Sequence, residues 1–262
     1  MVDLGANAAR LAAFAARPSR RVLSHPIAGA PVDTVLRSLS YRPETASRFG
    51  STSWTAMLAR VALNDVERRT WQAIHTSPRR RREWLLGRVV AKDAVRSWLA
   101  RSHGVVIGPR AISIATTPAG APYVDHIVGF NEAPPPAVSL AHSSTTIVAA
   151  SGPASIALGV DVESRDRSIH ALARALDADE LRFVESARLE VIDALAAKEA
   201  ASKALGIGLG GSLRRWPIRG FRAGPVPGLL IDPPDGHRGQ VTVEILMVGS
   251  NVVAVAKCDP HH

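Results

Sequence analysis

Cysteine is almost absent from this sequence, since Cys258 is the only one in 262 residues. A single thiol cannot form an internal disulfide, is too little for a cysteine-based metal site and fits a reducing cytoplasm. Long apolar runs are also lacking, because no stretch reaches the roughly 18 apolar residues of a membrane-spanning helix. Residues 1–17 lack the basic end, apolar core and cleavage site of a signal peptide. We therefore expect a cytoplasmic protein with no membrane partner.

Aromatic and acidic residues are scarce as well. Aromatics make up 5% of the chain, so its core must consist mostly of Leu, Val, Ile and Ala. Basic residues outnumber acidic ones by 32 to 23, which gives a formal net charge of +9. This balance favours an acidic partner: nucleic acid, a polyphosphorylated ligand or an acidic protein surface. Composition does not choose among these, because codon usage alone can enrich arginine.

The chain divides into a poorly determined beginning and two longer stretches. Residues 1–52 carry scattered prolines and short apolar clusters, which leaves open a loosely packed arm or the tail of a linker. Residues 53–153 and 154–262 form the two halves, and in each the helices precede most of the strands. This order predicts an α+β fold of two similar halves packed side by side, each with helices on a small, mostly antiparallel sheet.

Hydrophobic periodicity and turn residues set the expected elements. We expect a short element over residues 54–62 and helices over residues 65–74, 79–100, 172–184 and 187–205. We expect strands over residues 111–115, 137–140, 145–150, 155–163, 216–222, 241–248 and 252–257. The last two strands are joined by Gly249-Ser250-Asn251 as a hairpin.

Two acidic residues lie in the expected strand over residues 155–163, within Gly-Val-Asp-Val-Glu. Because side chains alternate along a strand, Asp161 and Glu163 project to one face while Val160 and Val162 face the core. Two carboxylates on one face repel unless a cation lies between them or water screens them. Mg²⁺ suits such a pair, since it binds through a few carboxylates and keeps positions for phosphate oxygens. The alternative is a strand end with two solvated acids.

A charged pair occupies the expected helix over residues 187–205. Glu199 and Lys203 share a helical face with the apolar Ile192 and Leu195. Charges on an apolar stripe are unusual, because a buried charge needs a partner. A surface pair at i, i+4 remains the plain alternative.

Basic and hydroxyl side chains form two further candidate sets. His142 lies within Ser-Leu-Ala-His-Ser-Ser at the end of an expected strand, where it can donate to a phosphate together with backbone N–H groups. Residues 79–92 begin with four arginines and continue through Arg88. One or two of these arginines can reach a phosphate, which the guanidinium fork suits. A structural histidine and a solvated helix face are the competing interpretations.

The order and spacing of these motifs are more specific than any one of them. An Arg-rich helix with Trp-Leu-Leu-Gly-Arg is followed by Ser-Leu-Ala-His-Ser, Gly-Val-Asp-Val-Glu and Lys-Glu-Ala-Ala-Ser-Lys. This arrangement resembles the 4'-phosphopantetheinyl transferases of the larger, surfactin-synthetase-activating type. The resemblance covers about residues 60–215, and its most specific part is the last two motifs. It implies two similar α+β halves related by pseudo-two-fold symmetry, with the active site between them.

The resemblance also implies an activity and its residues. The phosphopantetheine arm of coenzyme A would pass to a serine of an acidic acyl or peptidyl carrier protein, as used in fatty-acid, polyketide and peptide synthesis, with release of 3',5'-ADP. Mg²⁺ would be held by Asp161, Glu163 and Glu199, and Glu199 or a water on the metal would accept the serine proton. Lys203 would neutralise the pyrophosphate. The implied coenzyme A contacts are Arg82, Arg88, Lys92, Ser139, His142, Ser143 and Lys203.

Two positions depart from that family. The turn Gly120-Ala121-Pro122 lacks the lysine that commonly contacts coenzyme A there, and Leu195 stands where the family favours tryptophan. Two other functions stay open: an inactive transferase-fold domain of a larger synthase, and a basic nucleic-acid-binding module. The intact acidic and lysine motifs argue against the first. Basic residues interleaved with exposed aromatics are lacking, so we expect no nucleic-acid partner.

Overall fold

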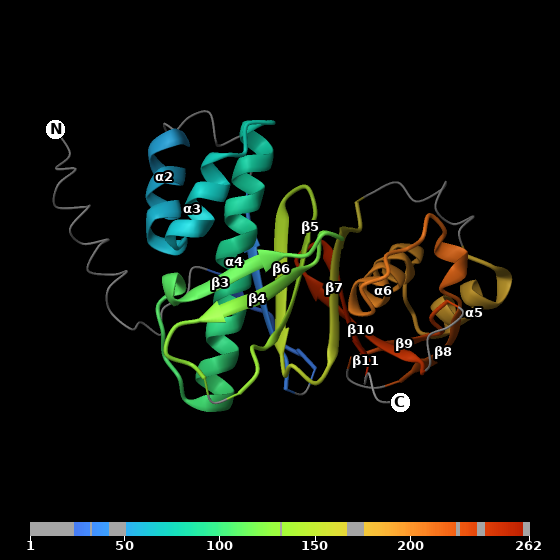
Figure 1. The fold of residues 1–262 in the computed structure, drawn as a ribbon. Helices are drawn as coiled ribbons and strands as arrows, with labels where there is room; N and C mark the ends of the chain where they lie inside the picture. Colours follow the sequence, from blue (N-terminus) through green and yellow to red (C-terminus); the bar gives the residue numbers. More distant parts are fainter. Residues whose placement is uncertain are drawn as a thin grey trace.

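The computed structural model describes residues 24–31, 33–41, 51–131, 133–166, 176–223, 226–234 and 239–258. These form a mixed α+β structure with antiparallel sheets, as the sequence predicts. The helices are α2 (Ser51–Ala62), α3 (Asp65–Gln72), α4 (Pro78–His103), α5 (Ala178–Ser186) and α6 (Val191–Ala204). Figure 1 shows α2, α3 and α4 on one side of the molecule, α5 and α6 on the other, and strands between them.

The N-terminal half is built around α4 and a four-stranded sheet. The sheet contains β1 (His25–Pro26), β2 (Val35–Ser40), β5 (Ala137–His142) and β6 (Thr146–Gly152) in the order β1-β2-β6-β5. A separate hairpin joins β3 (Ile112–Thr116) and β4 (Pro122–Ile127). Ile147 and Ala149 of β6 belong to the core beneath α4, whereas Val148 and Ala150 face the other half. The sheet is therefore buried on both faces.

The C-terminal half carries α6 on a five-stranded sheet. Its strands are β7 (Ala157–Ser164), β8 (Ile218–Arg222), β9 (Gly228–Ile231), β10 (Val241–Val248) and β11 (Asn251–Cys258), in the order β7-β11-β10-β9-β8. Val160 and Val162 of β7 join Ala141 and Val148 of the first sheet in one buried cluster. The two halves thus share a core, and β7 lies next to that shared core.

A buried Lys–Glu pair ties the helices of the N-terminal half together. Asn64 and Glu67 form a capping box at the start of α3, and Lys92 of α4 donates to the Glu67 carboxylate. The other carboxylate oxygen of Glu67 accepts the Ile114 N–H at 3.0 Å. The Lys92 ammonium has no exposed surface, so its charge is compensated entirely within the protein.

The C-terminal half repeats this set of contacts. Asp177 and Glu180 form a capping box at the start of α5, and Lys198 of α6 lies 2.6 Å from the Glu180 carboxylate. The same carboxylate accepts the Ile218 N–H at 2.8 Å. In each half a capping-box glutamate therefore joins the long helix to a following strand.

Assigning all of residues 1–52 to an arm or linker is wrong for the part that the structure describes. Residues 35–40 form β2, an inner strand paired with β6, and Leu36 is buried in the shared core. Prolines on either side of this short apolar run suggested a loop. The partner strand lies more than 100 residues further along the chain, so local sequence gave no sign of the pairing. Residues 1–23 and 42–50 lie outside the described residues.

Most other expected elements are confirmed, with shifted ends. The helix expected over residues 187–205 begins at Val191, because Glu190 forms a capping box. The helix expected over residues 172–184 is α5, which begins at Ala178; residues 172–175 lie outside the described residues. β4 and β9 were not predicted. Among the described helices, none has the length and apolar character needed to cross a membrane.

Candidate functional site

The acidic residues of β7 are brought against α6 by a glycine. A Cβ atom at Gly159 would lie 1.9 Å from the Ala200 carbonyl oxygen and 2.6 Å from the Ala204 nitrogen. Only a residue without a side chain allows the helix backbone to approach the strand this closely. Asp161 lies two residues further along β7 and so points to the same face, toward α6.

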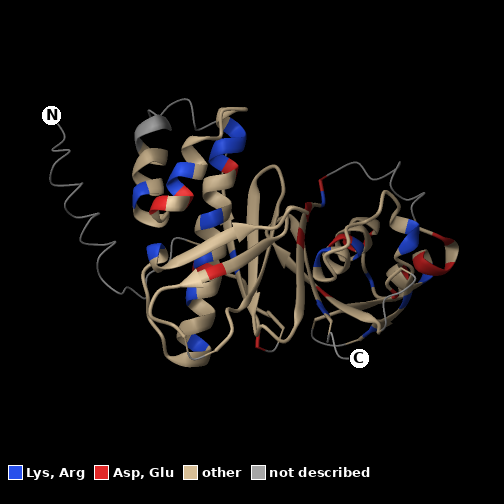
Figure 2. Ribbon diagram, viewed as in Figure 1, with Lys and Arg blue, Asp and Glu red and all other residues tan. Residues whose placement is uncertain are grey.

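Three carboxylates and one ammonium meet at this contact. Oxygens of Asp161, Glu163 and Glu199 all lie within 4.8 Å of one another. The Lys203 Nζ lies 2.7 Å from Asp161 Oδ1 and 3.5 Å from Glu199 Oε1. Figure 2 shows the acidic positions on β7 beside those on α6. The structure therefore brings together every residue that the sequence nominated for the metal and for catalysis.

Asp161 is the most perturbed member of the cluster. Burial raises the pKa of its carboxyl to about 6, the Lys203 ammonium opposes this rise, and Glu199 and Glu163 add to it. Its Oδ2 atom is buried and has no hydrogen-bond partner among the described residues. A buried, unpaired carboxylate oxygen beside two further acids is costly in the protein alone. A second cation would remove this cost.

The donor set fits a divalent cation. Carboxylate oxygens are the ligands that Mg²⁺ takes in proteins, and three acids leave further positions for oxygens of a phosphate group. The unpartnered Oδ2 of Asp161 can bind the cation as a carboxylate ligand without breaking a hydrogen bond to any described residue. Glu199 is partly exposed, so the cluster is open to ligands on one side.

An arginine that sequence reasoning missed holds the ends of these two elements together. Arg165 follows β7, and its guanidinium donates to both carboxylate oxygens of Asp193, at 3.2 and 2.5 Å. It also lies 3.2 Å from Glu190, at the start of α6. Asp193 is completely buried, so this pair connects the strand end to the helix core. An arginine two residues after Glu163 and an aspartate on the first turn of the helix were the available sequence signals.

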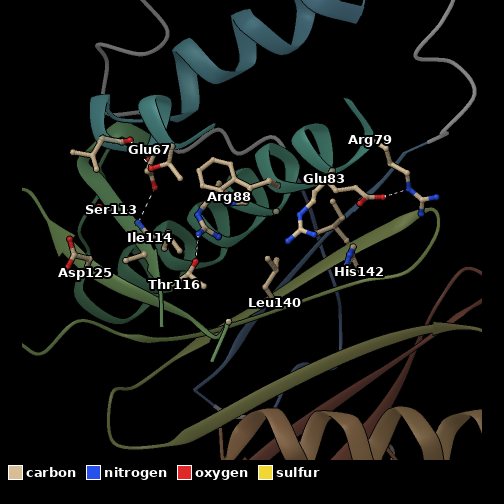
Figure 3. A pocket seen from close by; sticks show the side chains of 18 of the residues that line it. Glu67, Arg79, Glu83, Arg88, Ser113, Ile114, Thr116, Asp125, Leu140 and His142 are labelled. Atoms are coloured by element: carbon tan, nitrogen blue, oxygen red, sulfur yellow. Dashed lines mark hydrogen bonds and ion pairs between the residues drawn. The ribbon is translucent and has the colours of Figure 1, made fainter. Parts of the chain in front are cut away.

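A cavity of about 950 Å³ opens in the N-terminal half, among α3, α4, the β3–β4 hairpin, β5 and β6. Figure 3 shows Arg88 pointing across it, with its guanidinium hydrogen-bonded to Thr116 at 2.6 Å. Arg88 also stacks 4.6 Å from the Trp84 ring, and its Nε is buried without a hydrogen-bond partner in the described part of the chain. Burial lowers the pKa of this arginine, so an anion in the cavity would stabilise its charge.

The cavity contains some of the predicted coenzyme A contacts. Arg88 and His142 line it, and Arg79 lines the end near His142 (Figure 3). His142 lies at the end of β5, and β5 also contacts β7 through the Ser139 hydroxyl, which accepts the Val160 N–H at 3.0 Å. One strand therefore borders both the cavity and the strand that carries the acids.

Three other predicted contacts have structural partners instead. Lys92 is fully buried against Glu67, so its ammonium cannot reach a ligand from that position, and we no longer assign it to phosphate. The Ser139 hydroxyl is buried and joins the two sheets. The Ser143 hydroxyl accepts the Thr146 N–H at 3.2 Å and shapes the β5–β6 turn. Helical periodicity shows on which face of the helix a lysine lies, but it does not show which acid forms an ion pair with it.

The coenzyme A contact of Arg82 stays a prediction. Its Nε is buried and finds no hydrogen-bond partner in the segments that the structure describes, and the side chain is partly exposed on the first turns of α4. The neighbouring Arg81 stacks 4.0 Å from the Trp71 ring, on the α3 side of the helix. The run of arginines therefore divides among several surroundings, as its helical spacing requires.

No protein-family model matches the chain, and no curated protein matches it.

Proposed function

We propose that the chain transfers the 4'-phosphopantetheine arm of coenzyme A to a serine of an acidic acyl or peptidyl carrier protein in the cytoplasm. The observation that carries this proposal is the meeting of Asp161, Glu163, Glu199 and Lys203 at one contact between β7 and α6. A carboxylate cluster with an adjacent ammonium suits a reaction in which charge moves between phosphate oxygens.

Two similar halves with an active site between them form part of the proposal. The matched contacts of Glu67 with Lys92 and of Glu180 with Lys198 support a common origin of the halves and a pseudo-two-fold relation. The strand β7 supports the placement of the site, since its one face meets α6 and its other face meets the first sheet. A substrate bound along the edge of this interface would meet the acids on the α6 side of β7 and His142 at the end of β5.

Each residue has a distinct task in the proposed reaction. Asp161, Glu163 and Glu199 would hold Mg²⁺, which would supply charge stabilisation to the pyrophosphate. Glu199 is partly exposed. It accepts the proton of the carrier serine as the serine oxygen attacks the β-phosphorus. Lys203 neutralises the pyrophosphate as the phosphorus–oxygen bond to the 3',5'-ADP leaving group breaks. Arg88 and His142 bind and orient the remaining phosphate and nucleoside groups.

Intact-mass spectrometry tests the proposal. The protein is incubated with coenzyme A, MgCl₂ and a panel of apo carrier proteins from fatty-acid, polyketide and peptide synthases. At least one carrier should gain the mass of one phosphopantetheine group, and its serine-to-alanine variant should gain none. A separate reaction with a transferase known to modify these carriers serves as the positive control. If that control succeeds and this protein modifies no carrier in the panel, the proposal is contradicted.

A further inference from the structure

We infer that Lys203 is a displaceable counter-ion, which occupies the acidic cluster in the metal-free protein and leaves it when a divalent cation binds. The inference rests on the proposed function only in its assignment of a cation to Asp161, Glu163 and Glu199. It concerns how that site is regulated, and transfer need not be measured to test it.

The position of the ammonium carries the first step. Lys203 Nζ lies between Asp161 and Glu199, which are two of the three expected metal ligands. A cation bound to oxygens of both residues would therefore lie within a few ångströms of the ammonium. Two positive charges at that separation in a partly buried site repel each other strongly. One of them must move.

The surroundings of Lys203 allow this movement. The lysine one and a half turns earlier on α6, Lys198, is fully buried and also donates to the Leu213 carbonyl at 3.2 Å. Lys203 is 30% exposed, lies on the last turn of α6, and among the described residues bonds only to the two carboxylates. Lys198 is held by a closed set of partners, whereas Lys203 can swing into solvent.

The orphaned oxygen of Asp161 shows that one ammonium is not enough. Lys203 bonds to Oδ1, while Oδ2 stays buried without a partner among the residues described, and Glu163 and Glu199 remain beside it. A divalent cation carries more charge and accepts several oxygens at once, so it compensates the cluster better than the ammonium does. The displaced ammonium is then free to meet the anionic group of a substrate, which couples metal binding to substrate binding.

The test measures Mn²⁺ binding by electron paramagnetic resonance and melting temperature with and without MgCl₂, in the absence of coenzyme A and carrier protein. Lys203→Met removes the competing charge and should bind Mn²⁺ about tenfold more tightly than the wild type. Without metal this variant should melt about 2–4 °C lower, because three carboxylates lose their counter-ion, and saturating MgCl₂ should remove the difference.

Two matched variants separate the site from general charge. Lys203→Arg keeps the charge and should bind Mn²⁺ about as weakly as the wild type. Arg60→Met removes the same charge from the exposed face of α2 and should leave Mn²⁺ binding unchanged. Equal or weaker Mn²⁺ binding by folded Lys203→Met, or no binding by any variant, would overturn the inference. Failure of the transfer assay would leave these results standing, so the two failures are distinguishable.

Discussion

The acids that follow the buried lysines of α4 and α6 have opposite electrostatic surroundings. On α4, Asp93 follows the buried Lys92, and on α6, Glu199 follows the buried Lys198. Asp93 accepts hydrogen bonds from Ser24 at 2.9 Å and from Arg96 at 3.1 Å. Its helix therefore presents an acid that is compensated by basic and polar partners.

The neighbouring strands complete the contrast. In the N-terminal half β2 contributes Arg37, which is attracted electrostatically to Asp93 and donates to the Ser24 hydroxyl at 3.1 Å. In the C-terminal half β7 contributes Asp161, a second acid facing the acid of its helix. The acid of α4 is therefore surrounded by basic and polar partners that stabilise the fold. The acid of α6 lies beside further acids. Such an electrostatic cost is expected where a ligand removes it, which supports the proposal that the C-terminal cluster is the functional site.

Removing the like charge should produce the largest effect. Asp161→Asn keeps the shape of the side chain but removes a metal ligand, so the rate of transfer should fall by about 10³-fold or more. The free energy of unfolding of the metal-free protein should not fall, because a buried charge disappears. Chemical denaturation and intact-mass kinetics on the same preparation measure both quantities. Wild-type transfer by this variant would remove Asp161 from the site.

The matched change in the N-terminal half should act on stability alone. Asp93→Asn leaves Arg37 and Arg96 without their acid, and we expect the free energy of unfolding to fall by about 2–4 kcal/mol. Transfer per folded molecule should stay near the wild-type value. A loss of transfer without a loss of stability would show that this network belongs to the active site, against the contrast drawn above.

The buried lysine of α4 should give the N-terminal half a distinct pH dependence. Burial lowers the pKa of Lys92 to about 8 although Glu67 opposes the shift. The folded protein then binds fewer protons than the unfolded chain between this pKa and the unfolded value near 10.5. Stability from Lys92 therefore rises with pH across that window and is lost as pH falls toward 8.

Denaturation of the wild type and of Lys92→Met over this pH range checks the sign. The wild type should gain about 1–3 kcal/mol relative to the variant between pH 8 and pH 10.5. The two proteins differ only in this side chain, so the difference between their stabilities reports on the lysine. A wild type that loses stability relative to Lys92→Met over the same range would contradict the shift.

The smallest expected effect concerns how the basic surface meets a carrier protein. Figure 2 shows many basic positions over α3 and α4, and the chain carries a net charge of +9. Association with an acidic carrier should slow several-fold between low salt and about 0.15 M salt, with little change in dissociation. The measurement uses protein saturated with coenzyme A and a carrier whose serine is alanine. An association rate independent of salt would assign the contact to apolar surface.

The residues of the candidate site were easier to predict from the sequence than the long-range strand pairing and packing. Strand alternation alone places Asp161 and Glu163 on one face, and helical spacing places Glu199 beside Lys203. Their meeting depends on Gly159, whose bare backbone admits α6, and a sequence shows a glycine without showing what approaches it. β2 was not predicted, because its pairing with β6 joins segments far apart in the sequence.

The phosphate contacts were predicted less well for a related reason. Lys92 and Arg88 lie one helical turn apart on α4, so periodicity treats them alike. Tertiary contacts separate them: α3 supplies Glu67 to Lys92, whereas Arg88 faces a cavity. Local spacing defines candidate faces, and only the packed structure shows which charge is already compensated.

Metal dependence of transfer tests the central claim most directly. Protein and coenzyme A are treated with EDTA, mixed with an apo carrier that the wild type modifies, and followed by intact mass before and after MgCl₂ is added in excess. The carrier should keep its mass in EDTA and gain one phosphopantetheine group once Mg²⁺ is present. Full modification in EDTA would show that the cluster of Asp161, Glu163 and Glu199 is not a metal site required for the reaction.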